Sequence, residues 1–556
     1  MRFFQVKHTH NWRTPSHELP HNARRGRGVL ATALFSFLLS AVPSIAVAQR
    51  TDSPPRKLPS AERIVGDYIR AIGGKKRLAA IADATYEWSV KLQEQTLGVA
   101  RTQIKAPVSV RTTMTFGNGV IDAAANTSSA WERGLDGHVR TLTGAEAGAA
   151  KLQGILDAGR LLDYKRLSVL ARAVAVDNAA LEPAYVVEFS LRNGSHLRYS
   201  FSVARKFLLQ ITDEARRTTT VFGDYRAENN VLEPHRKEVN VAGTGSLTFL
   251  LEGVKYNTGL AATAFDPPRG TETLDIPGLM REVSRNQDVL EERTAEYAFT
   301  QKETTREIND RGELKKETVR IYEVFPVANR DPVYKLISEN GVALSAERAA
   351  KEEKRVQEEL VKAEKEGQEN KEKRERLKAE LAKKRAAGKA EEDDPGISQF
   401  LRACEFVSPR RERFRDRDAI VFDFRPRADF HPANRAESLI SKLVGVIWID
   451  PIDRQVMRME ARLAEGFKVG GGLVVSLRPG AAMVMEQTRM EDGVWLPRLA
   501  HFNLSIRVLL FGGGDINKTF EWSDYKHFQG NVDSYKLESP PGNNAPTKDK
   551  PPDRLR

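Results

Sequence analysis

An internal repeat constrains the fold of this chain more than any other feature. A shift of 263 positions places residues 221–240 on residues 484–503 without a gap. Six identities then follow in order: Val221 and Val484, Arg226 and Arg489, Glu228 and Glu491, Val231 and Val494, Pro234 and Pro497, Asn240 and Asn503. The repeat reads as a strand, an acidic turn and a second strand, so it predicts a tandem duplication of one unit. An earlier hairpin aligns at a shift of 248, which gives the second copy 15 extra residues (263 − 248); these are expected to include Gly470–Gly472 as a longer hairpin.

The order of periodic segments predicts an α+β fold with antiparallel sheets. Apolar residues at helical spacing follow Ser60, and Gly73-Gly74 ends that helix. Strand patterns come next, then a helical pattern from Ala145 to about Val174, and then many strands separated by turns such as Asn193-Gly194 and Asn229-Asn230. Helices and strands are grouped rather than alternating, which favours antiparallel sheets over a parallel α/β fold.

The expected domain organisation follows from these patterns and from composition. Residues 1–48 are a signal-peptide region, 49–59 a linker and 539–556 a disordered tail. The two repeated units occupy 60–272 and 276–538, and the second contains a charged insertion at 345–394.

The N-terminal segment predicts export. Basic residues precede an apolar run from Val29 to Val42, and Ala46-Val47-Ala48 forms a small-x-small cleavage pattern before Gln49. A run of this length is too short to span a bilayer, so no membrane span is expected and the protein is assigned to the periplasm or cell envelope. His17 to His21 spells a metalloprotease motif, but Pro20 interrupts the helix that zinc binding needs.

The insertion at 345–394 is balanced in charge. It holds 15 Lys or Arg and 15 Asp or Glu residues, the composition of a solvated helix. Apolar residues follow a coiled-coil spacing at its ends, but Gly367, Asn370 and Arg374 occupy the middle of that seam. One long exposed helix, or a hairpin bent at Gly367, is therefore favoured over a dimeric coiled coil.

No catalytic, cofactor or metal motif is found, so the chain is not expected to be an enzyme or to carry a cofactor or metal. Its single cysteine, Cys404, excludes a disulfide framework. A lowered thiol pKa is conceivable there, although a half-buried structural cysteine is favoured. The net charge of +12 falls to +7 without residues 1–48, which hold six Lys or Arg and one acid. The arginine cluster at Arg410–Arg417 is interpreted as a solvated loop, or as a peripheral contact with anionic lipid, and no nucleic-acid partner is expected.

Large apolar residues alternate along several strands and so share one face of each sheet. They either pack on the helices of their own unit or line a cavity for an apolar ligand. The candidates for such a cavity are Tyr86, Trp88, Tyr199, Phe201, Phe249, Phe422, Phe424 and Phe502.

Short motifs in both units resemble the periplasmic lipoprotein-carrier, or outer-membrane lipoprotein-sorting, superfamily. In the first unit these are residues 68–74, Asp136-Gly137, and Phe222 to Arg226 running into Val231 to Pro234. In the second they are Trp448 to Pro451, Val494 to Pro497 and Trp522 to Tyr525. The resemblance implies strongly curved, half-barrel antiparallel sheets, closed by a few helices, that hold acyl chains or another hydrophobic ligand.

Two functions remain open at this point. One is an exported protein that binds a lipid or the acyl chains of lipoproteins, with a role in their trafficking. The other is an envelope scaffold that contacts a protein partner through 345–394 and transports no ligand.

Overall fold

The computed structural model describes residues 58–243, 245–270, 273–294, 296–309, 314–327, 332–362, 400, 403–469, 475–508 and 512–527. The signal-peptide region, most of the linker, the tail and most of the charged insertion therefore lie outside the described residues. The described residues form two separate antiparallel sheets.

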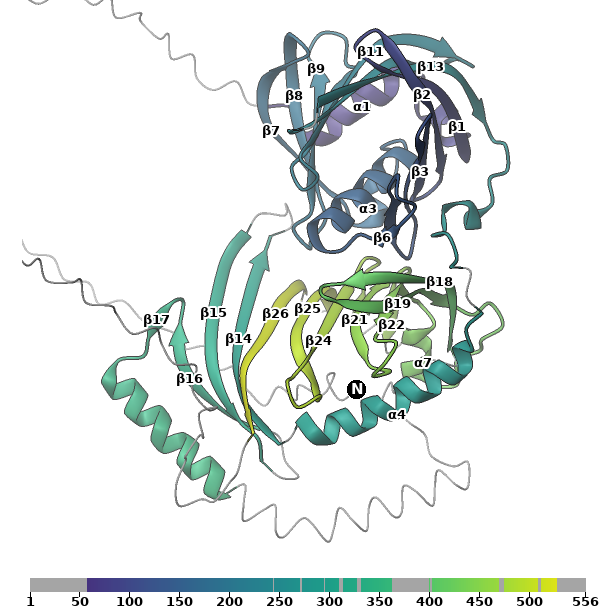
Figure 1. Ribbon diagram of the computed structural model, residues 1–556. Helices are drawn as coiled ribbons and strands as arrows, with labels where there is room; N and C mark the ends of the chain where they lie inside the picture. The colour runs from purple at the N-terminus through teal and green to yellow at the C-terminus, as the bar shows by residue number, and fades with distance from the viewer. Residues whose placement is uncertain are drawn as a thin grey trace, which may run out of the picture. The chain divides into compact units, whose positions relative to one another are not determined.

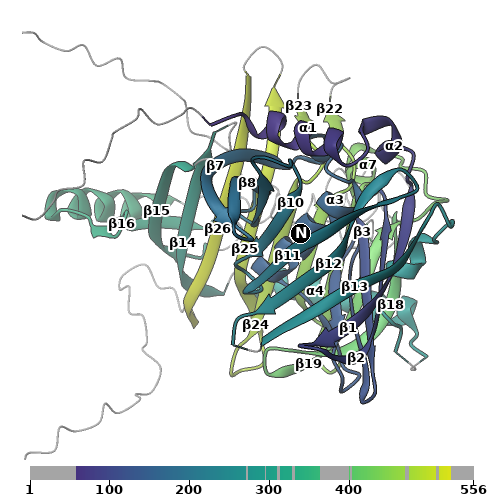
Figure 2. The same ribbon diagram turned by 90° about the horizontal axis from the view of Figure 1, so that it is seen from above.

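The first sheet curves around its helices α1 and α3 (Figure 1). Its strands run in the order β6-β5-β4-β3-β2-β1-β13-β12-β11-β10-β9-β8-β7, and β11, β12 and β13 lie side by side when seen from above (Figure 2). Their bounds are β1 Asp83–Leu92, β2 Gln95–Lys105, β3 Ser109–Phe116, β4 Gly119–Ala125, β5 Ala130–Arg133, β6 Val139–Thr141, β7 Leu170–Ala179, β8 Glu182–Ser190, β9 His196–Ser202, β10 Leu208–Asp213, β11 Thr218–Glu228, β12 Val231–Val241 and β13 Gly245–Tyr256. The helices are α1 Ala61–Ala71, α2 Lys75–Ala79 and α3 Gly144–Ala158, with short 3₁₀ turns η2 Tyr164–Leu167 and η3 Ala262–Phe265.

The second sheet has the order β17-β16-β15-β14-β26-β25-β24-β21-β20-β19-β18, with β22 and β23 forming a hairpin beside β25. Its strands are β14 Tyr297–Ile308, β15 Leu314–Phe325, β16 Val333–Glu339, β17 Val342–Ala343, β18 Cys404–Phe414, β19 Arg417–Pro426, β20 Leu443–Ile449, β21 Val456–Leu463, β22 Phe467–Val469, β23 Val475–Leu477, β24 Ala482–Arg489, β25 Trp495–Val508 and β26 Gly512–His527. Its helices are α4 Ile276–Thr294 and α7 Arg435–Ile440, and a further helix covers 346–362.

The two strand orders correspond when β1 is set against β14. Strands β13, β12, β11, β10, β9, β8 and β7 then match β26, β25, β24, β21, β20, β19 and β18 in sequence. The register agrees over part of this pair, because Val221 opposite Glu238 becomes Val484 opposite His501 at the shift of 263. It differs by one residue beyond the register shift at Glu486 and Gln487, since Arg226 pairs with Glu233 whereas Arg489 pairs with Trp495. The β22–β23 hairpin flanks Gly470–Gly472, where the repeat predicted extra residues.

Local sequence explains how α1 begins and ends. The hydroxyl of Ser60 accepts a hydrogen bond from the backbone N–H of Arg63, which caps the first turn. Gly73 and Gly74 adopt positive φ values of 141° and 85°, which end the helix where other residues would be strained. The expected turns at Asn193-Gly194 and Asn229-Asn230 are also present, with positive φ at Gly194, Asn229 and Asn230.

Two sequence expectations are wrong at the level of secondary structure. The helical pattern expected as far as Val174 ends at Ala158, and β7 begins at Leu170 as the edge strand beside β8. Its alanines have no strong strand preference, so the pairing with β8 decides the conformation. The arginine cluster is not a solvated loop: β18 extends through Phe414, and β19 begins at Arg417.

The described start of the insertion packs against the second sheet. In the helix over 346–362, Val356 and Leu360 are buried against Phe325 and Val333. Nothing in the described residues tests the exposed helix, the bend at Gly367 or the coiled coil expected for the rest of the segment.

Candidate functional site

The inner face of the first sheet is lined by aromatic and aliphatic side chains from neighbouring strands. Trp88 lies opposite Leu251, Phe249 lies opposite both Val90 and Lys237, and Val239 lies opposite Leu247. Since paired residues in a ladder point to the same face, these side chains form one continuous surface. Several residues of this face remain half-buried although they touch the core, among them Met114, Phe116, Phe222, Val239 and Leu247, and so do Tyr68 and Ile69 on α1.

A buried polar cluster lies on this face, between β12 and the end of α3. The carboxylate of Glu233 accepts hydrogen bonds from the Tyr86 hydroxyl at 3.0 Å, the Tyr256 hydroxyl at 2.8 Å and Arg160 Nη1 at 3.1 Å. Arg160 Nη2 also donates to the Tyr86 hydroxyl at 2.8 Å, and its guanidinium lies over the Tyr256 ring. The side chains of Arg160 and Glu233 are each only 9% exposed, so this is a buried ion pair with hydrogen-bonded partners.

Lys237, four residues further along β12, shares this inner face. Its Nζ lies 3.9 Å from the centroid of the Trp88 ring and 5.3 Å from that of Phe249, a cation–π arrangement. Burial lowers the pKa of Lys237 to about 8, and the charge of Asp157 offsets only part of that effect. At neutral pH the ammonium is therefore still mostly charged.

Asp157 projects from α3 toward the same region. Its Oδ1 lies 3.5 Å from the Tyr199 hydroxyl, at the limit of a hydrogen bond. Burial raises the pKa of Asp157 to about 6, although Gln153, Lys237, Arg216 and Tyr199 all favour the ionised form. The inner face thus combines an aromatic wall with two titratable groups whose pKa values are displaced toward neutrality.

The structure places the eight predicted cavity residues in separate clusters. Tyr86, Trp88 and Phe249 lie together beside Lys237, whereas Tyr199 and Phe201 pack with α1 and α3. In the second sheet, Phe422 and Phe424 are fully buried and contact Phe406. Phe502 is half-buried and meets Phe520 edge-on.

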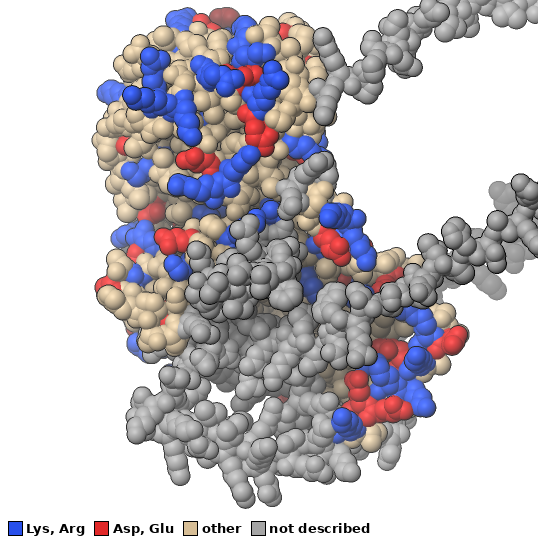
Figure 3. Space-filling view, turned by 180° about the vertical axis from the view of Figure 1, so that it is seen from behind, with Lys and Arg blue, Asp and Glu red and all other residues tan. Residues whose placement is uncertain are grey.

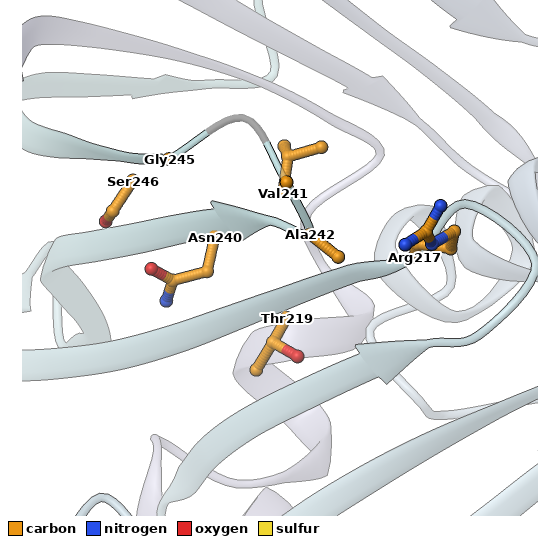
Figure 4. A pocket seen from close by; sticks show the side chains of 8 residues that line it. Arg217, Thr219, Asn240, Val241, Ala242, Gly245 and Ser246 are labelled. Atoms are coloured by element: carbon orange, nitrogen blue, oxygen red, sulfur yellow. The ribbon is translucent and has the colours of Figure 1, made fainter.

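An open hollow lies at one end of β11, β12 and β13, with side chains of Arg217, Thr219, Asn240, Val241 and Ser246 around it (Figure 4). Thr219 pairs with Asn240 and Asn240 with Ser246, at positions of opposite parity to Lys237 and Val239. The hollow therefore lies away from the inner face, and none of the eight predicted residues lines it.

The surface of the first unit carries charges of both signs. Seen from behind, Lys and Arg side chains are spread over it with Asp and Glu among them (Figure 3). The arginine cluster of the second unit is partly inward-facing, because Arg410 is 3% exposed and pairs with Glu412 at 2.7 Å and Asp423 at 3.0 Å. Arg410 is thus excluded from the lipid contact considered for the cluster.

The structure also bears on Cys404, on metal-binding side chains and on membrane-spanning helices. Cys404 is buried, and burial raises the pKa of its thiol to about 12, so the lowered thiol pKa is wrong. Within the described residues, no group of three or more His, Cys, Asp or Glu side chains is placed to hold a metal ion. No helix in the same part of the chain is long and apolar enough to cross a membrane.

Sequence reasoning missed the polar members of the inner face. Only apolar residues were assigned to that face, yet Glu233 and Lys237 have the same parity along β12 as Val231 and Val239. Two charged residues at the same alternating positions as the buried residues of a strand could have indicated that they share the inner face. No sequence pattern predicts that Arg160 and Asp157 reach this face, because their positions depend on how α3 packs inside the curved sheet.

The fold belongs to the class built on large antiparallel sheets with few helices. No family model matches the chain, and no curated protein matches its sequence. Among solved structures, a DUF1329 family protein from Desulfovibrio piger is similar at 13% identity over 37% of this chain and 97% of its own, with a TM-score of 0.27. A LolA superfamily protein from Nitrosomonas europaea gives 11% identity over 38% and 99%, with a TM-score of 0.26. MucB in the Pseudomonas aeruginosa MucA/MucB complex gives 8% identity over 83% and 94%, with a TM-score of 0.16. The neighbours include the superfamily that the sequence motifs resemble, and at these scores they say nothing further about function.

Proposed function

We propose that this chain is an exported protein of the periplasm or cell envelope that binds a hydrophobic ligand, a lipid or the acyl chains of a lipoprotein, in its first unit. The observation that carries the proposal is the inner face of the first sheet, where half-buried apolar side chains line a curve that is packed, among the described residues, by α1, α2, α3 and the short turn η2. Apolar groups left half-exposed on a concave face gain free energy when a ligand covers them, at roughly 25 cal/mol per Å².

The proposal includes a tandem origin. The matching strand orders and the partly shared register at the shift of 263 support duplication of one unit. The unit boundaries at 60–272 and 276–538 remain part of the proposal, as does cleavage after Ala48. Sequencing of the exported protein is expected to begin at Gln49.

Ligand binding is tested on protein purified from the periplasm. Native mass spectrometry is expected to show bound acyl species, and the delipidated protein is expected to bind the neutral probe N-phenyl-1-naphthylamine. Leu247→Glu places a charge on the inner face and is expected to abolish probe binding. Leu250→Glu is the matched control, because Leu250 is equally half-buried on the same strand but lies opposite Arg236, away from the core. The absence of both bound lipid and probe binding from the folded wild-type protein would overturn the proposal.

An envelope scaffold is the second candidate function. It is favoured by one observation, that the charged segment starts from a helix fixed to the second sheet by Val356 and Leu360. Deleting residues 363–394 leaves that anchor in place. The scaffold function predicts that the deletion removes crosslinks between this chain and envelope proteins while N-phenyl-1-naphthylamine binding is unchanged; retention of the same crosslinks would exclude it.

A further inference from the structure

The inner face of the first sheet holds hydrogen-bond donors without acceptors. The indole Nε1 of Trp88 is buried and has no hydrogen-bond partner, and the same is true of Arg160 Nε. Among the described residues, Lys237 Nζ has cation–π contacts with Trp88 and Phe249 and a longer-range interaction with the charge of Asp157, and it makes no hydrogen bond or salt bridge.

These donors are close to one another. The ammonium of Lys237 lies on the ring that carries the unpartnered Trp88 Nε1. Tyr86 stacks beside that ring, with 6.0 Å between centroids, and Arg160 donates to the Tyr86 hydroxyl. A buried donor left unpaired costs on the order of 1 to 3 kcal/mol, so its retention needs a reason.

Among the described residues, the unpartnered buried polar atoms of the first sheet are nitrogen atoms and not oxygen atoms. The other unpartnered nitrogen of the first sheet, His235 Nε2, lies 3.1 Å from Glu228 Oε1. The unpartnered buried acceptors among the described residues, Gln487 Oε1 and Asn517 Oδ1, belong to the second sheet, and Asp423 Oδ1 lies 3.0 Å from Arg410 Nη2. The described inner face therefore has unpartnered N–H groups on Trp88 and Arg160 and one cation without a salt bridge, Lys237, and no described oxygen atom accepts from them. An anionic oxygen group is the chemistry that satisfies both needs.

We propose that the ligand of the first unit is an amphiphile with an anionic group, a carboxylate or a phosphate, which pairs with Lys237 and accepts a hydrogen bond from Trp88 Nε1 while its hydrocarbon chain covers the half-buried apolar side chains. This inference rests on the proposed function, because it names the class of hydrophobic ligand that the same face takes. Asp157 limits how tightly an anion binds beside Lys237. It forms no salt bridge with Lys237 among the described residues, so its carboxylate repels a further negative charge nearby.

The test compares three probes that share one fluorescent sixteen-carbon chain and end in a carboxylate, its methyl ester or a phosphate monoester. Wild-type protein is expected to bind at least one of the anionic probes about tenfold more tightly than the ester, the typical effect of one charge-assisted hydrogen bond. Preference for the carboxylate assigns a fatty acid, and preference for the phosphate assigns a phospholipid-like ligand; either result supports the proposal.

Three variants locate the effect. Lys237→Met keeps an unbranched side chain on Trp88, and it is expected to lose the preference for the anion while binding the ester within about twofold of wild type. Asp157→Asn is expected to tighten binding of the anionic probe several-fold by removing a like charge. Lys91→Met is the matched control, because Lys91 is a half-buried lysine on β1, the strand that carries Trp88, at a position that alternates with the core residue Val90.

The outcomes separate the two proposals. Equal binding of ester and anions by the wild type, unchanged in Lys237→Met, would overturn the anionic class and leave a hydrophobic ligand standing. Failure of the wild type to bind any of the three probes would overturn the proposed function itself. Ester binding by Lys237→Met also shows that this variant is folded.

Discussion

Removing the carboxylate of Glu233 is expected to destabilise the first sheet far more than removing a surface carboxylate from the same strand. Glu233→Ala leaves the Arg160 guanidinium 9% exposed without its counter-charge, and it removes the acceptor of two tyrosine hydroxyls. Breaking a buried ion pair by deleting one partner costs about 3 to 5 kcal/mol, and the lost hydrogen bonds are part of that figure.

Glu238→Ala is the matched control on β12. Glu238 is 37% exposed and pairs with Arg236 at 3.4 Å, a surface ion pair that contributes about 0 to 1 kcal/mol. Hydrogen–deuterium exchange of peptides from β1 and β12 measures the effect within the first sheet. A loss of about 3 kcal/mol corresponds to roughly a hundredfold faster exchange of their slowest amides in Glu233→Ala, and Glu238→Ala is expected to stay within about fivefold of wild type.

A double variant separates the buried charge from the loss of packing. Replacing both partners, as Arg160→Met with Glu233→Leu, removes the unpaired cation and is expected to recover about 2 kcal/mol relative to Glu233→Ala. Equal exchange in Glu233→Ala and Glu238→Ala, or a double variant less stable than Glu233→Ala, would contradict a stabilising buried pair between Arg160 and Glu233.

Three further predictions concern other parts of the molecule. The pKa of Asp157 is about 6 in the folded protein and about 4 when unfolded, so the folded state holds the proton more tightly and stability falls as pH rises from about 4 to 6. Asp157→Asn should therefore be more stable than wild type at pH 7, by about 1 to 2 kcal/mol after allowing for solvent screening, and equally stable below pH 4. Urea titrations at several pH values measure this difference. A difference that stays constant across this range would contradict the raised pKa of Asp157. Cys404, with a thiol pKa of about 12, should not react with Ellman's reagent at pH 8 until urea unfolds the protein, and rapid reaction in the native state would show that the thiol is accessible. Val356→Asp should release the helix over 346–362 and expose it to limited proteolysis. Val361→Asp, at a position already 55% exposed, should be cleaved at the same rate as wild type. Identical cleavage of both variants would exclude the packing of this helix on Phe325 and Val333.

The sequence alone predicted many of the strands and an internal repeat. Alternation of apolar residues is a local property, and the turn residues at Asn193-Gly194 and Asn229-Asn230 fix chain reversals through their own φ preferences. At the shift of 263, the pairing of Val221 with Glu238 corresponds to that of Val484 with His501, whereas the pairing of Arg226 with Glu233 differs by one residue from that of Arg489 with Trp495. The strand β7 was missed because its alanines fit a helix as well as a strand, and only β8 supplies the hydrogen bonds that decide between them.

The character of the candidate site was decided by tertiary structure. Alternation assigned Tyr86 and Trp88 to one face of their strand and Phe249 to one face of another, because faces follow from parity along each strand. The structure places the three side chains in one cluster. Alternation could not show that Arg160 pairs with Glu233, or that Asp157 approaches Lys237. These residues are 73 and 80 positions apart in sequence (233 − 160 and 237 − 157), and they meet only because the sheet curves around α3. Periodicity shows which side of a strand a residue occupies. Charge pairing across a curved interior depends on how distant elements pack together, and no local sequence pattern predicts that packing.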